Sequence, residues 1–150
     1  MPVLADCLWL HSGWTQFRIE DSIMLFSRST DSGASWSSPV RISTRAGLPR
    51  DDNGSVEGWS GAVTSNGTLL MVVAHDSAIV LARSDDSGKS FSDSHVILQT
   101  GPLFFGIVFL DRCNGFPQIA VDQRTDTIHV TFADYSNGLL ASCGSTIQQR

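Results

Sequence analysis

Residues 29–36 read S-T-D-S-G-A-S-W, and residues 84–91 read S-D-D-S-G-K-S-F. The two octapeptides share Ser, Asp, Ser, Gly and Ser in the same order, and both end in an aromatic residue. Each follows an apolar run that ends in Arg-Ser, and these runs repeat at the same offset of 55 positions as the octapeptides. Each octapeptide also precedes a short β-rich run. The repeat therefore covers a whole strand–turn–strand unit and organises this chain.

Length and composition are typical of a folded, turn-rich chain. The 150 residues suffice for one domain with its own core, and 41% of them are hydrophobic, with 17% charged and 13 glycines. The net charge of −5, without a basic run, argues against nucleic acid as a partner. We also expect no membrane span, because the longest apolar run, residues 101–110, is too short to cross a bilayer.

The cysteines and histidines give no sign of a metal site. The three cysteines are widely spaced without a C-x-x-C pair, and the four histidines lack the spacing of metal ligands. We therefore expect no metal and no cofactor. The N-terminal residues lack the basic start and long apolar stretch of a secretory signal, which leaves the compartment unassigned.

The repeated unit is expected to be a small antiparallel sheet. Asn66-Gly67 between two β-rich runs is the strongest short signal of a hairpin, because both turn residues then need positive φ. A similar hairpin is expected around residues 123–126, and no segment shows a sustained helical period of apolar residues. The sequence therefore predicts an all-β chain of about ten strands. Its three units cover about residues 3–43, 59–98 and 117–147.

The octapeptides resemble the Asp-box of the BNR, or sialidase-like, β-propellers, in which S-x-D-x-G-x-[S/T]-[W/F] joins two strands of a blade. Two copies at blade spacing extend the resemblance over almost the whole chain. It implies antiparallel four-stranded blades, about two and a half of them, in one partial domain over residues 1–150. It also implies that the turns are structural. The residues concerned are Ser29, Asp31, Gly33, Trp36, Ser84, Asp86, Gly88 and Phe91.

The chemistry of the octapeptide accounts for its composition without a ligand. An Asp in a tight turn accepts hydrogen bonds from nearby backbone N–H groups, and Gly adopts the positive φ that the turn requires. The closing aromatic residue is expected to tuck beneath the turn and anchor it to the blade. We therefore interpret both octapeptides as fasteners of the fold.

A partial arc of blades raises the question of how its ends are covered. Propellers close a ring of about four to eight blades, and an open arc exposes sheet faces and edges. We expect closure by self-association, most simply as a homodimer with about six blades, because homo-oligomers favour closed symmetry. The alternative is that the chain is a piece of a longer protein.

The resemblance also implies which loops line the functional face. These loops join one blade to the next and the second strand of a blade to the third, over about residues 11–21, 44–59, 74–77, 99–117 and 133–138. Aromatic rings stack on sugars, and Arg binds carboxylates through paired hydrogen bonds. The candidates for ligand binding are Arg50, Arg112, Trp14, Trp59 and Asp134.

A sialidase-like glycoside hydrolase is one alternative function. The resemblance implies three arginines for the sialate carboxylate, a Tyr nucleophile activated by a Glu, and an Asp acid/base. The catalytic candidates are then Tyr135, Glu57 and Asp111. The F/Y-R-I-P motif that usually carries the first arginine reads F-R-I-E at residues 17–20, which argues against this activity.

Three functions are compatible with these residues. We favour a non-catalytic module that binds carbohydrate or another small polar ligand on its loop face. The alternatives are the sialidase-like hydrolase and a structural or protein-interaction scaffold.

Overall fold

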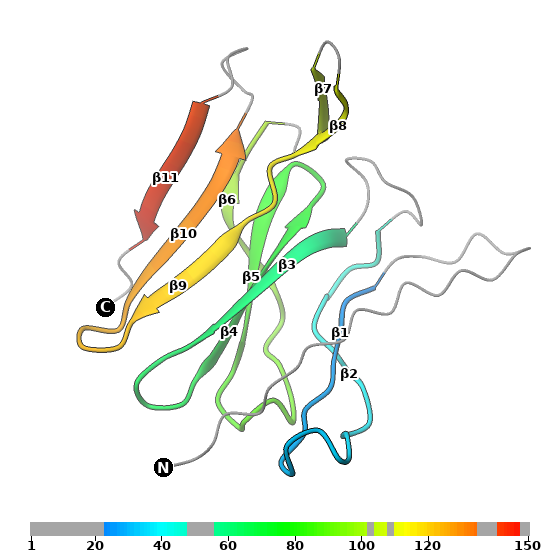
Figure 1. The fold of residues 1–150 in the computed structure, drawn as a ribbon, viewed down its shortest axis with the longest axis vertical. Helices are drawn as coiled ribbons and strands as arrows, with labels where there is room; N and C mark the ends of the chain where they lie inside the picture. The colour runs from blue at the N-terminus through cyan, green and yellow to red at the C-terminus, as the bar shows by residue number, and fades with distance from the viewer. Residues whose placement is uncertain (1–22, 48–55, 102–103, 108–109, 135–140, 148–150) are drawn as a thin grey trace, which may run out of the picture.

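The computed structural model describes residues 23–47, 56–101, 104–107, 110–134 and 141–147. These residues form eleven β-strands and no helix, and all strand pairs are antiparallel (Figure 1). The prediction of an all-β antiparallel chain is therefore confirmed. In this part of the chain there is accordingly no helix long and apolar enough to span a membrane.

The central sheet has four strands in sequence order, β3 (Val56–Val63), β4 (Leu69–His75), β5 (Ala78–Ser84) and β6 (His95–Gln99). A hydrogen bond of 3.0 Å from the Thr64 N–H to the Thr68 carbonyl closes the β3–β4 connection around residues 65–67. The connection is therefore longer than the expected two-residue turn. Gly67 alone in this connection takes positive φ, at 89°. The Asn66 side chain instead accepts a hydrogen bond from the Thr68 N–H at 3.2 Å, which fixes the loop from inside.

Three smaller sheets accompany the central one. The first sheet pairs β1 (Leu25–Phe26) with β2 (Val40–Arg41). The sheet that follows the central one, called here the third sheet, places β10 (Thr127–Asp134) between β9 (Gln118–Asp122) and β11 (Ala141–Ile147). A separate hairpin of β7 (Phe104–Ile107) and β8 (Leu110–Asn114) connects the central sheet to the third.

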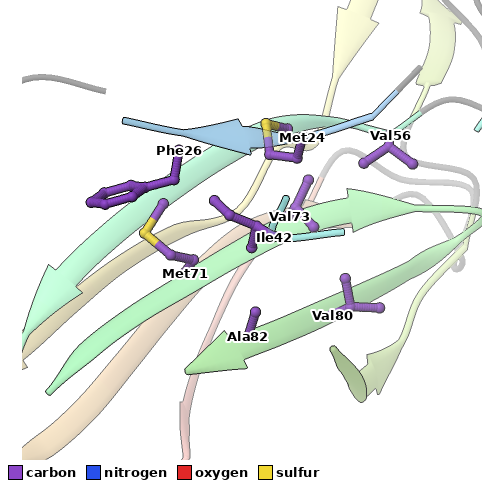
Figure 2. Close-up of a cluster of buried hydrophobic side chains, with 8 residues drawn as sticks. All are labelled: Met24, Phe26, Ile42, Val56, Met71, Val73, Val80 and Ala82. Carbon is purple, nitrogen blue, oxygen red and sulfur yellow. The ribbon is translucent and has the colours of Figure 1, made fainter. Parts of the chain in front are cut away.

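Apolar side chains hold three sheets face to face, with the central sheet in the middle. One face of the central sheet packs on β1 and β2 in the cluster shown in Figure 2, whose buried members are Met24, Phe26, Ile42, Val56, Met71, Val73, Val80 and Ala82. The opposite face packs on β9 and β10 through Leu70, Val72, Ile79, Leu81, Ile119 and Val130. Alternation along β4 and β5 produces both faces from continuous apolar runs, as expected of a sheet buried on both sides.

Two boundaries differ from the expected ones. Strand β3 begins at Val56, so Glu57 and Trp59 lie on a strand and not in a loop. Residues 99–117, expected to form a loop, contain the β7–β8 hairpin. The strand expected at residues 3–10 lies outside the described residues.

Candidate functional site

Strand direction separates the molecule into two ends. The two repeat turns lie at the same end as the β3–β4 and β9–β10 connections (Figure 1). The opposite end, called here the loop end, carries the start of β3, the β4–β5 turn at Asp76 and Ser77, and the β7–β8 hairpin. Most of the residues proposed from the sequence for ligand binding fall at the loop end or outside the described residues.

In the first repeat turn, the Asp31 carboxylate accepts hydrogen bonds from the residues around it. Its Oδ1 accepts from the Ser35 N–H and the Ser29 hydroxyl, each at 2.8 Å, and its Oδ2 accepts from the Ser35 hydroxyl. Ser29 is only 3% exposed and accepts the Gly33 N–H at 2.8 Å. Ser32 and Gly33 take positive φ of 58° and 87°. Side chains thus replace the ladder partners that the turn lacks.

The second repeat turn has the same network at matching positions. Asp86 Oδ1 accepts from the Ser84 hydroxyl at 2.8 Å and from the Ser90 and Lys89 N–H groups at 3.0 Å each. Its Oδ2 accepts from the Ser90 hydroxyl at 2.6 Å, and Ser84 Oγ accepts the Gly88 N–H at 2.9 Å. Both carboxylates are therefore held by donors of their own turns, which accounts for the Asp of each octapeptide in structural terms.

The closing aromatic residues of the two turns differ. Phe91 is partly buried against the first core cluster, and its ring lies 5.2 Å from the ring of Phe26 in an edge-to-face contact. Trp36 is 41% exposed, so the expectation that it tucks beneath its turn is wrong. The difference follows from the neighbours, since Phe26 of the first sheet provides the surface on which Phe91 packs.

Hydrogen bonding also sets the acidity of the turn carboxylates. The hydroxyl and N–H of Ser35, followed by the hydroxyl of Ser29, lower the pKa of Asp31 to about 2. The equivalent bonds from Ser90 and Ser84 hold the pKa of Asp86 well below its usual range. Because these bonds favour the ionised carboxylate, both turns carry a negative charge over the whole neutral range.

At the loop end, an irregularity in β3 places Glu57 and Trp59. The register of β3 against β4 shifts between Glu57 and Ser60, and Gly58 within the shift takes positive φ of 63°. Glu57 is half-buried at this position, and Trp59 packs partly on the first core cluster. β-Bulges are frequent next to binding sites because they redirect the side chains around them.

The β4–β5 turn brings a second group of polar side chains to the loop end. His75 ends β4, and the following residues Asp76 and Ser77 both take positive φ, at 49° and 59°. Burial lowers the pKa of His75, and Arg45 acts in the same direction while Asp76 opposes both. The imidazole is therefore neutral at pH 7 and can both donate and accept a hydrogen bond.

The remaining candidates are placed only in part. Asp111 and Arg112 lie on β8 and Asp134 ends β10, all at the loop end of their strands or in its hairpin. Trp14, Arg50 and Tyr135 lie outside the described residues. No three His, Cys, Asp or Glu side chains are grouped as metal ligands among the side chains that the structure describes.

One feature of the loop end was not predicted from the sequence. A Cβ atom at Gly58 would lie 2.6 Å from the Cβ of Phe116 and nearer still to its ring, so the ring occupies the space that a side chain at position 58 would fill. On the sequence alone, Gly58 is expected in a loop, over residues 44–59. A Gly within a strand often marks a bulge or a close contact, so its place among β-rich residues is the one local signal for this feature.

Comparison with known proteins gives no relative. No protein-family model, no curated protein and no solved structure matches the chain.

Proposed function

We propose that this chain is a partial β-propeller module of the sialidase-like type, and that it binds carbohydrate or another small polar ligand at its loop end. The observation that carries the proposal is the structural difference between the two ends of the molecule. At one end the repeat turns are closed on themselves, whereas the other end holds a bulge, a strained turn and a separate hairpin with charged residues.

Repetition of the sheet packing supports the blade interpretation. Met24 and Phe26 of the first sheet, which face the central sheet, match Ile79 and Leu81 of the central sheet in the repeat, which face the third sheet. Each sheet therefore presents the same face to the next one. The strands β3 and β9 also lie beside each other, so the central and third sheets converge at their first strands as blades do around an axis.

The chemistry of the loop end suits a polar ligand. Glu57 and Asp76 provide acceptors for hydroxyl groups, His75 provides a neutral donor and acceptor, and Trp59 presents an aromatic ring that is partly buried. Few precisely placed polar groups beside apolar surface are typical of small-ligand sites. Sugar hydroxyls with apolar C–H faces match this combination.

A glycan array tests the proposal directly. We expect the chain to bind a subset of the immobilised oligosaccharides, and Glu57→Gln and Asp76→Asn to weaken this binding at least tenfold, since one charged hydrogen bond contributes about 1.5–3 kcal/mol. Asn tolerates the positive φ of position 76. Asp93→Asn, an exposed carboxylate near the second repeat turn, is the matched control and should bind as the wild type does. An array without any bound glycan would contradict the proposal and favour the scaffold.

A further inference from the structure

We infer that the contact between Gly58 and Phe116 anchors the base of the β7–β8 hairpin, which carries Asp111 and Arg112, to the Glu57–Trp59 segment of β3. Its importance for binding rests on the proposed function, whereas the contact itself does not. The proposal adds Gly58 and Phe116 as positioning residues, which act through the hairpin and not by touching the ligand.

The contact leaves no room for any other residue at position 58. Gly58 takes φ of +63°, which side chains rarely adopt, and a Cβ there would overlap Phe116 from its Cβ outward into the ring. The register shift between Glu57 and Ser60 presents this Gly to the ring. The bulge therefore acts as a notch in β3 that accepts one aromatic side chain.

Two hydrogen bonds join the chain just beyond Phe116 to β3, the strand that contains Gly58. Ser60 Oγ accepts the Ile119 N–H at 3.2 Å and donates to Gln118 Oε1 at 3.4 Å. Pro117, between Phe116 and these residues, is fully buried. Phe116 is therefore the last point in a short row of attachments that runs from the third sheet toward the hairpin.

The position of the hairpin depends on the contacts at its base, where the chain leaves β8. Strands β7 and β8 pair only with each other among the strands that the structure describes. An isolated two-stranded hairpin is at best marginally stable in water. Phe116 follows Asn114, the last residue of β8, by two positions, so the notch holds the hairpin at the point where it leaves the sheets.

This arrangement would couple the two halves of the candidate site. Glu57 and Trp59 flank Gly58 on β3, while Asp111 and Arg112 lie on β8, a few residues before Phe116. A ligand that contacts both strands requires a fixed distance between them, and small displacements of positioned groups weaken binding strongly. The notch supplies that fixed distance.

Hydrogen–deuterium exchange and the glycan array test the proposal together. We expect Phe116→Ala to increase exchange at residues 104–107 and 110–114 about tenfold, to leave exchange in β5 unchanged, and to abolish glycan binding. Gly58→Ala should do the same through overlap with the ring. Phe116→Tyr, which keeps the ring, should restore both hairpin protection and binding.

Gly67→Ala is the matched control. Gly67 also takes positive φ, at 89°, but a Cβ there would meet nothing within 4 Å. It should lower overall stability without selective exchange in the hairpin. If Gly58→Ala does not fold, Phe116→Ala decides.

Unchanged hairpin exchange in Phe116→Ala would overturn the positioning contact. Faster exchange with unchanged glycan binding would overturn its role at the site. A wild-type chain that binds no glycan would overturn the proposed function and the role at the site with it, while the exchange data would still decide the contact.

Discussion

At the scale of single residues, buried serines and exposed carboxylates divide the work of the repeat turns. Ser29 and Ser84 are 3% and 2% exposed, and each accepts a hydrogen bond from the backbone N–H of the turn glycine and donates one from its hydroxyl to the Asp. Each Asp accepts further donors at the surface. Leaving such a buried N–H without an acceptor is costly, which explains why the turn repeats Ser and Asp together.

The depressed acidity of these carboxylates predicts loss of stability in acid. The pKa of Asp31 falls from 3.8 in the unfolded chain to about 2, and that of Asp86 is lowered in the same direction. A lowered pKa stabilises the fold above the unfolded value and ceases to do so as pH falls through the folded value. We therefore expect the contribution of these two carboxylates to the free energy of unfolding, measured with urea, to be constant above about pH 5 and to decrease from pH 4 toward pH 2. The lowered pKa of His75 adds a separate decline that begins as pH falls below 6.5, the unfolded value.

Replacement of the two carboxylates checks the assignment. The double variant Asp31→Asn/Asp86→Asn should be less stable than the wild type at pH 7 and should lose less stability between pH 4 and pH 2. Asp85, Asp122 and Asp126 also have lowered pKa values, so some acid dependence should remain. An equal profile in the double variant would show that other groups cause the acid loss.

At the scale of elements, the two repeat turns are chemically alike but packed differently. Gly33 and Gly88 occupy the same place in the repeat and take φ of 87° and 76°. A Cβ at Gly33 would meet nothing within 4 Å, whereas one at Gly88 would lie 2.9 Å from Phe26 Cζ. The second turn is therefore part of the contact between the first and central sheets, whereas Gly33 has no such neighbour among the residues that the structure describes.

This difference predicts unequal effects of the same substitution. Gly33→Ala should destabilise by about 1 kcal/mol, the cost of positive φ alone. Gly88→Ala should cost about 1–3 kcal/mol more, because the methyl group must displace the Phe26 ring. Urea unfolding at pH 7 measures both. In Phe26→Leu the extra cost of Gly88→Ala should shrink; equal costs at positions 33 and 88 would contradict this account of the packing.

The elements also show where sequence reasoning succeeds and where it fails. Strands β4, β5 and β6 follow from apolar runs on either side of Asn66-Gly67 and the second octapeptide, because such local signals do not depend on the neighbours. The β7–β8 hairpin was assigned to a loop from the repeat pattern, although Phe104 and Phe105 favour a strand. The Gly58–Phe116 contact joins distant residues, and no local pattern specifies such a pair.

At the scale of the whole molecule, the central and third sheets face the same way in the stack, but the side chains on their equivalent faces differ in polarity. Leu70 and Val72 on β4 are 3% and 0% exposed where they face the third sheet. The matching positions of β10, counted from Thr68 and Thr127, are His129 and Thr131, and both are exposed on the outward face. A polar outer face is typical of the last repeat in a stack.

This surface bears on the expected closure of a ring by a second copy. A copy that packed on β10 as the third sheet packs on β4 would have to bury His129 and Thr131 in place of Leu70 and Val72. Taking these polar side chains out of water costs free energy that the burial of Leu70 and Val72 does not cost. We therefore expect self-association to be weak, so that light scattering after size exclusion gives a molar mass that falls toward 16.2 kDa on dilution. The variant His129→Leu/Thr131→Val should associate more strongly, since it makes the face apolar. A wild-type dimer that persists below micromolar concentration would contradict this expectation and support the closed ring.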